Sequence, residues 1–304
     1  MSFGATFLTN PDLFPARRSG EPWGDRSAVL DLPGGPYRFS GLSADQEAGV
    51  FGRFGGLRTT AAPAVETPVF RASPADFLEI DVRGWEYGLD LDAGPDALRI
   101  AGLDLLGRLD WRPGLAGALW TSVGGGDRFP GIFENFCRIL VAYRLHELGG
   151  AVIHGAGLMM DGEGLLFAGP SGAGKSTSSR MGLERGLTVL SDDLNALLPP
   201  DGAEGEGRVR LAGLPFTGDL EGGPAAVVPL RGLYRLEKAP EDALRPLGKA
   251  EAVALLLACS PFLNADSHRR GELLSTLLAL AERMPAWELR FSLRGGMWDI
   301  LTGQ

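Results

Sequence analysis

The sequence is poor in cysteine and histidine, with 2 cysteines and 3 histidines in 304 residues. So few cysteines exclude a disulfide-stapled scaffold, and both Cys137 and Cys259 lie in apolar, helix-like contexts. We therefore expect two buried, reduced thiols, with a disulfide between them as the less favoured alternative.

Long hydrophobic runs are also lacking. The longest apolar stretch, Ala252 to Cys259, is far too short to cross a bilayer. Residues 1–20 do not have the positively charged start and the apolar run of a signal peptide. The sequence therefore predicts a soluble, cytoplasmic protein with no membrane partner.

An excess of positive charge is the third absence: 29 Lys and Arg stand against 38 Asp and Glu, a formal net charge of −9. A general binder of nucleic acid or of an anionic membrane needs clustered cationic residues. The composition argues against both partners, so any recognition of phosphate must be local.

Residues 1–127 are predicted to form a β-rich N-terminal portion. Up to about residue 75, Gly, Pro and Ala are typical of short elements and loops, with a short helix from Asp45 to Phe54 capped by Ser43. Short β-like runs then recur about every ten residues, which predicts a small antiparallel sheet. These runs are Phe77–Val82, Trp85–Leu91, Leu98–Ile100, Leu103–Leu109 and Leu115–Thr121.

Residues 128–304 are predicted to form a second domain, of the α/β class. Apolar residues recur at helical spacing from Ile132 to Tyr143, and Gly149-Gly150 would end that helix. Strands, hairpins and helices follow, which differs from the regular βαβ alternation of a doubly wound protein and predicts a mixed sheet. Function is legible in this half, whereas the N-terminal portion offers only a role in substrate recognition.

The clearest motif matches the P-loop pattern G-x-x-x-x-G-K-[S/T] over Gly169-Pro170-Ser171-Gly172-Ala173-Gly174-Lys175-Ser176. An apolar run, Gly164–Ala168, precedes it and a proline-free stretch follows, as the strand–loop–helix context requires. A glycine-rich turn is the alternative, but this context argues against it. The residues expected to contact a nucleotide are Gly169, Ser171, Gly172, Ala173, Gly174, Lys175, Ser176 and Thr177.

The motif assigns chemistry to two of these residues. Glycines let the backbone turn its N–H groups towards phosphate oxygens, and the helix dipole adds positive potential. Lys175 would then lie against the β- and γ-phosphates of ATP, and the Ser176 hydroxyl would bind Mg²⁺.

Phosphoryl transfer also needs carboxylates near the γ-phosphate, and Asp192-Asp193 follow the predicted strand Leu187–Leu190. Successive side chains of an extended backbone point in opposite directions, so one carboxylate can face the metal and the other the acceptor hydroxyl. A turn or a helix cap is the alternative for such a pair. His154 stands at the end of the strand that opens this region; alone, such a histidine is more often structural than catalytic.

His154-Gly155, the glycine motif and Ser191-Asp192-Asp193 together resemble the HPr kinase/phosphorylase family, including the kinases of lasso-peptide precursors and, more distantly, ATP-dependent phosphoenolpyruvate carboxykinases. The resemblance covers order and spacing over about 45 residues. It implies an HPr-kinase/carboxykinase-type P-loop domain and an ATP-dependent kinase that acts on a serine hydroxyl. One of the aspartates, with Asp192 favoured, would be the general base; Asp193 would hold Mg²⁺ with Ser176, and His154 would contact the γ-phosphate or tune the base.

Two departures put HPr as substrate, and the reverse reaction, in doubt. Thr177 stands where the HPr enzymes usually have an acidic residue, and the signature linked to phosphorylase activity is replaced by Ala212–Asp219, either a substrate loop or a plain connection. The predicted acceptor is a serine on a peptide or protein. A kinase of free serine or a similar metabolite and a non-catalytic nucleotide sensor are the alternatives, and a homo-oligomer is left open.

Overall fold

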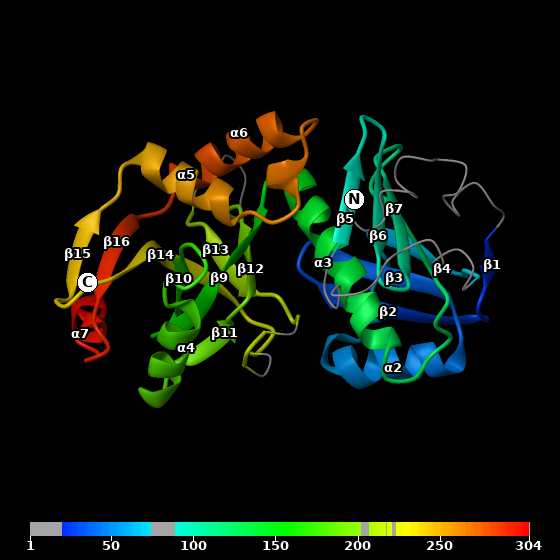
Figure 1. The fold of residues 1–304 in the computed structure, drawn as a ribbon, viewed down its shortest axis with the longest axis horizontal. Coiled ribbons are helices and arrows are strands. Elements are labelled where there is room, and N and C mark those ends of the chain that lie inside the picture. The colour runs from blue at the N-terminus through cyan, green and yellow to red at the C-terminus, as the bar shows by residue number, and fades with distance from the viewer. Residues whose placement is uncertain (1–19, 74–88, 202–206, 217, 221–222, 304) are drawn as a thin grey trace. The chain divides into compact units, whose positions relative to one another are not determined.

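The computed structural model describes residues 20–73, 89–201, 207–216, 218–220 and 223–303 (Figure 1). The chain divides into two compact units, Met1–Val141 and Ala142–Gln304, and the division falls within the helix α3 (Phe129–Glu147). Both units contain mixed sheets with helices, so the protein is of the α/β class with a β-rich N-terminal part.

The N-terminal unit is built on one sheet, in which eight strands of the described residues pair in the order β2-β3-β4-β8-β7-β6-β5, with β1 beside β4. The pairs β3–β4 and β4–β8 are parallel and the others are antiparallel. The strands are β1 (Glu21–Pro22), β2 (Arg26–Leu32), β3 (Gly35–Leu42), β4 (Val65–Arg71), β5 (Leu89–Ala93), β6 (Ala97–Gly102), β7 (Leu105–Asp110) and β8 (Ala116–Thr121).

The predicted antiparallel sheet is confirmed for β6, β7 and β8, but it is only part of a larger mixed sheet. The predicted strand Phe77–Val82 and residues 85–88 of the next lie outside the described residues. The short elements expected in residues 1–75 include three strands that were not assigned from the sequence, β2, β3 and β4, which join this sheet. Alternation buries Ala28, Leu30 and Leu32 of β2, a period-two signal that the surrounding glycines and prolines obscured.

Among the described residues of this unit, the helices α2 (Ala44–Phe54) and α3 pack against the sheet. The predicted cap is confirmed: Ser43 Oγ accepts from the Gln46 N–H at 3.0 Å, and the Gln46 side chain accepts from the Ser43 N–H, a capping box for α2. In α3, Phe133 packs its ring edge-on to Phe39, with centroids 4.5 Å apart. A short 3₁₀ helix, η2 (Gly55–Leu57), follows α2.

The C-terminal unit has a second mixed sheet, whose strands within the described residues pair in the order β10-β9-β12-β13-β14-β16-β15. The pairs β10–β14 and β14–β16 are parallel, so β14 closes the path back onto β10. The strands are β9 (Ala151–Met160), β10 (Glu163–Ala168), β11 (Thr188–Ser191), β12 (Leu194–Leu198), β13 (Arg210–Gly213), β14 (Val227–Lys238), β15 (Ala243–Pro246) and β16 (Ala286–Phe291).

Helices lie on both sides of this sheet. Figure 1 shows α5 and α6 on one side of β9 and β10, and α4 on the other. The predicted helices after Lys175, from Ala250 and from Glu272 are confirmed. The elements are α4 (Lys175–Glu184), α5 (Lys249–Cys259), η5 (Leu263–Ala265), α6 (Arg270–Ala281) and α7 (Met297–Thr302).

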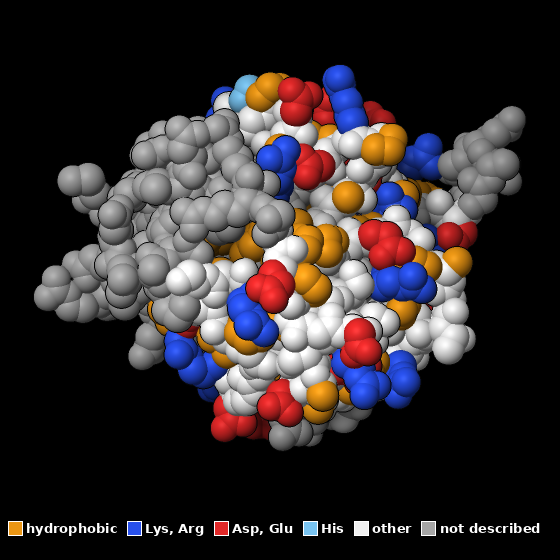
Figure 2. Space-filling view, turned by 90° about the vertical axis from the view of Figure 1, so that its right-hand side faces the viewer, with side chains coloured by type: hydrophobic (Ala, Val, Ile, Leu, Met, Phe, Trp, Pro, Cys, Tyr) orange, Lys and Arg blue, Asp and Glu red, His pale blue; other side chains and the backbone are white. Residues whose placement is uncertain are grey.

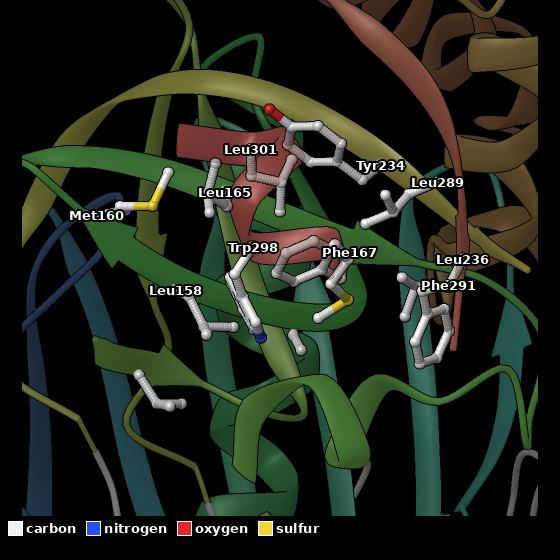
Figure 3. Packing of buried hydrophobic residues seen from close by; sticks show 13 residues of the cluster. Leu158, Met160, Leu165, Phe167, Tyr234, Leu236, Leu289, Phe291, Trp298 and Leu301 are labelled. Atoms are coloured by element: carbon white, nitrogen blue, oxygen red, sulfur yellow. The ribbon is translucent and has the colours of Figure 1, made fainter. Parts of the chain in front are cut away.

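The core of the C-terminal unit packs α7 against β9, β10, β14 and β16 (Figure 3). Phe167 of β10 meets Trp298 of α7 edge-on, with centroids 6.0 Å apart, and lies 5.5 Å from the ring of Tyr234 on β14. Phe291, at the end of β16, belongs to the same cluster. This packing holds the carboxyl ends of β10 and β16 together.

Both cysteines are buried and free, which confirms the expected reduced thiols. Burial raises the pKa of the Cys137 thiol and of the Cys259 thiol, so both behave as small apolar side chains at neutral pH.

Acidic and basic side chains alternate over the face drawn in Figure 2. Ion pairs of the N-terminal unit include Arg108 with Asp110 at 2.7 Å and Arg38 with Glu66 at 3.7 Å. Among the helices that the structure describes, none combines the length and the apolar character needed to cross a bilayer.

The packing of Trp298 generates a stability prediction. Its side chain is buried, but no hydrogen-bond partner of its ring N–H is found among the described residues. Trp298→Ala should lower the free energy of unfolding by about 3–5 kcal/mol, because a large cavity forms. Trp298→Phe should cost far less, since it keeps most of the ring contacts and removes the buried N–H. Urea denaturation measures both values, and equal losses in the two variants would contradict this account.

Candidate functional site

The glycine loop, Gly169–Gly174, connects β10 to the first residue of α4. Gly174 has φ +115°, which side chains rarely adopt, and a Cβ there would come within 2.5 Å of the Phe291 ring. The loop is therefore held against the core at a point where only glycine fits. At the start of α4 the backbone N–H groups have no partner within the helix, which makes this end a site for anions.

Lys175, the first residue of α4, is buried, and its side chain turns back onto this loop. Its Nζ donates to the carbonyl oxygens of Gly169 at 3.0 Å and Pro170 at 3.2 Å. A buried ammonium is costly unless its charge is compensated, and two carbonyl dipoles compensate it only in part. The Lys175 ammonium group is thus held by two carbonyl oxygens of the glycine loop, and an anionic ligand would be a stronger partner for it.

The other predicted loop residues differ in exposure. Ser171 and Gly172 are exposed, Ala173, Ser176 and Thr177 are half-buried, and Gly169 and Gly174 are buried. Behind the loop, the Cys259 thiol at the end of α5 lies 4.0 Å from the Gly169 carbonyl oxygen. The loop thus has one face open and one face packed.

His154 is not at a strand end, as predicted, but is the fourth residue of the ten-residue strand β9. Residues 151–154 of β9 pair with β12 and residues 157–159 pair with β11, both antiparallel, so the break between β11 and β12 falls opposite Gly155, next to His154. The His154 side chain is exposed, and its Nδ1 lies 3.0 Å from Asp193 Oδ1. Asp193 lies in this break between the two strands, where the imidazole reaches its carboxylate.

Asp192 and Asp193 follow β11 and face different partners, as alternation predicts. Asp193 pairs with His154, whereas Asp192 Oδ2 accepts the backbone N–H of Asp219 at 3.0 Å. Asp219 in turn accepts a hydrogen bond from Ser176 Oγ at 2.9 Å. A chain of contacts therefore joins the start of α4 to Asp192.

The environment of Asp192 makes its carboxyl a weaker acid than an exposed aspartic acid. Burial raises the pKa of this carboxyl above its ordinary value, and the carboxylate of Asp219 adds to the rise. Backbone N–H groups of Asp192, Asp219 and Leu220 act in the opposite direction by bonding the charged form. A nearby cation would lower the pKa of Asp192, so its protonation depends on what the site holds.

Two polar residues of this region were missed by sequence reasoning. Asp219 lay in the segment Ala212–Asp219, which was described only as a substrate loop or a plain connection. Buried Asn195 donates from Nδ2 to the Gly155 carbonyl at 2.8 Å and to the Ser191 carbonyl at 3.3 Å. It ties the strand of His154 to the segment of the aspartates. The signal that could have identified Asn195 is an amide side chain inside the apolar run that follows the aspartates.

The donor set suits a hard cation bound together with phosphate. Within the described residues, no three Asp, Glu, His or Cys side chains converge on one point as a preformed metal cage. Mg²⁺ is commonly held by one or two carboxylates or hydroxyls together with phosphate oxygens and water. Ser176, Asp192, Asp193 and Asp219 offer the oxygen atoms for such a shared site.

The fold is of the α/β class with a mixed sheet. In the site, β10, the glycine loop and α4 position Lys175 and Ser176, and Ser176 contacts Asp219. The family model of the SynChlorMet cassette protein ScmC matches residues 133–302. Since this match covers more than half of the sequence, the chain belongs to the ScmC family. A comparison with curated proteins found no match.

The raised pKa of Asp192 predicts how stability changes with pH. The folded state binds this proton more tightly than the unfolded chain, so ionisation lowers stability as pH rises from the unfolded towards the folded pKa. Asp192→Asn removes this loss. The difference in unfolding free energy, variant minus wild type, should rise as the pH increases above about 4, the ordinary pKa of an aspartic acid.

Glu251 is the matched control, because its pKa is lowered by the backbone N–H of Gly248 and by Arg245. Its charged form stabilises the folded state above the unfolded pKa, and that contribution is lost on acidification. Glu251→Gln should therefore show the opposite trend. Urea denaturation at several pH values measures both, and parallel trends would refute the assignment.

Proposed function

We propose that this protein is an ATP-dependent kinase of the HPr-kinase-like type, which transfers the γ-phosphoryl group of MgATP to a serine-type hydroxyl of a peptide or protein. The proposal is supported above all by the glycine loop and by the Lys175 ammonium group that its carbonyl oxygens hold. Lys175 sits at the entrance to α4, and Ser176 contacts the segment that binds Asp192. Phosphate recognition, a metal ligand and a candidate base thus occur together.

In this proposal the glycine loop binds the phosphates. Lys175 exchanges the carbonyl oxygens of Gly169 and Pro170 for phosphate oxygens, which carry a full charge and form stronger hydrogen bonds. Mg²⁺, when bound, neutralises charge on the phosphates. Ser176 and Asp193 are the predicted ligands that would hold it.

Asp192 is proposed as the general base. It accepts the proton of the serine hydroxyl while the serine oxygen forms its bond to phosphorus and the bond from that phosphorus to the bridging oxygen of ADP breaks. Its hydrogen bond from the Asp219 N–H orients the carboxylate. A carboxylate has lone pairs for further donors, so this contact leaves room for the acceptor hydroxyl.

His154 is proposed to act through Asp193. The His154 imidazole, with Nδ1 3.0 Å from Asp193 Oδ1, would orient that carboxylate beside the phosphates. The β-rich N-terminal unit, which has no motif of this chemistry, is proposed to select the acceptor. The protein is further proposed to act in the cytoplasm.

The proposal predicts that label from γ-labelled MgATP enters a discrete acceptor in an extract of the source cell. Lys175→Ala should abolish transfer because it weakens phosphate binding. Asp192→Asn should lower the rate by about 10²–10⁴-fold, the usual contribution of proton transfer, while ATP still binds.

The fractions of the extract separate the alternatives. Label in free serine or another small metabolite, with no peptide present, would replace the peptide acceptor by a metabolite. Binding of ATP with no label in any fraction would overturn the kinase and leave a nucleotide sensor, which would be indifferent to Asp192→Asn.

A further inference from the structure

Asp219 connects Ser176, at the start of α4, with Asp192, which follows β11. It lies after β13 in the chain. Its side-chain Oδ2 accepts a hydrogen bond from the Ser176 hydroxyl, with 2.9 Å between the two oxygen atoms. Its backbone N–H donates to Asp192 Oδ2 at 3.0 Å. Side chain and backbone thus hold the predicted metal ligand and the predicted base at the same time.

The approach of this segment depends on glycine. A Cβ on Gly218 would collide with Oδ1 of Asp192 and would lie 3.3 Å from the Cβ of Asp193. The backbone at residues 218–219 therefore passes in direct contact with both aspartates. Asp219 is placed by this contact, not by the reach of a flexible side chain.

The contact of Asp219 with Ser176 has a chemical consequence. A serine hydroxyl has one proton and two lone pairs, and an ionised carboxylate can only accept. When the Ser176 hydroxyl donates its hydrogen bond to Asp219, the lone pairs of Ser176 Oγ point away from that carboxylate and are available to a cation. The pair lies at the surface, where such a bond contributes little to stability.

We propose that Asp219 is a positioning residue for the divalent cation: its carboxylate orients the Ser176 hydroxyl for metal binding and adds a negative charge beside it. Groups that hydrogen-bond to metal ligands generally raise metal affinity in this way. The inference rests on the proposed function, since it assumes a nucleotide in the glycine loop. It adds a residue to that site without changing the reaction.

The test measures ATP affinity by calorimetry, with excess Mg²⁺ and with EDTA, and takes the ratio as the gain from the metal. Asp219→Asn keeps the backbone N–H to Asp192 and the shape of the side chain. It should reduce the gain from Mg²⁺ by about 10–100-fold. Affinity in EDTA should be unchanged or tighter, because a negative charge near the phosphates is removed.

A double-mutant cycle shows whether Asp219 acts through Ser176. In a Ser176→Ala background, Asp219→Asn should cause little further loss of the Mg²⁺ gain, since the hydroxyl that it orients is gone. Asp201→Asn is the control, because this exposed carboxylate pairs with Arg210. It should leave both affinities as in the wild type, and thermal unfolding checks that all variants fold.

Two results would overturn the inference while sparing the proposed function. One is an undiminished Mg²⁺ gain in Asp219→Asn with normal ATP binding. The other is an equal loss of affinity with Mg²⁺ and with EDTA, which marks a purely structural role. Failure of the wild type to bind ATP would overturn the proposed function, and the inference with it.

Discussion

The parallel pairing of β10 with β14 and of β14 with β16 is the constraint on which the candidate site depends. It brings the carboxyl ends of β10 and β16 to one edge of the sheet, so that Phe291 presses on Gly174. The glycine loop cannot relax at that point, because its φ angle and its contact with the ring both exclude a side chain. The start of α4, with Lys175 and Ser176, therefore lies at the same edge of the sheet.

The second half of the site depends on a break between two strands that pair with β9. β12 pairs with residues 151–154 of β9 and β11 with residues 157–159, and Asp192 and Asp193 lie in the break between these two strands. Buried Asn195 donates to the carbonyl oxygens of Gly155 and Ser191 beside this break. His154 reaches Asp193 at the same place, so an irregularity of the sheet carries the polar residues.

Membership of the ScmC family covers residues 133–302, which contain every residue proposed to act in catalysis. The N-terminal unit lies almost entirely outside this match and has its own sheet and core. That separation agrees with a division of labour in which one unit carries the chemistry and the other the choice of acceptor. The relation to HPr kinases remains part of the proposal, since it depends on the order and spacing of the motifs.

The sequence by itself determined the local features of this protein. Glycine, lysine and serine at fixed offsets predicted the loop between β10 and α4, and Ser43 predicted a helix start, because such signals involve neighbours in the chain. The different partners of Asp192 and Asp193 followed from alternation along an extended backbone. Residues 1–127 were predicted to be β-rich, but the strands β2–β4 were not assigned one by one, because glycines and prolines around them obscured the alternation.

Only the tertiary structure decided which polar groups meet. Ser176 and Asp219 are 43 positions apart, and their contact depends on the path of β13 and of the segment after it. Asn195 and Gly155 are 40 positions apart and meet because β9 lies beside β12. Pairing of strands and close contact of backbones set these distances, and neither is encoded in the spacing of residues along the chain.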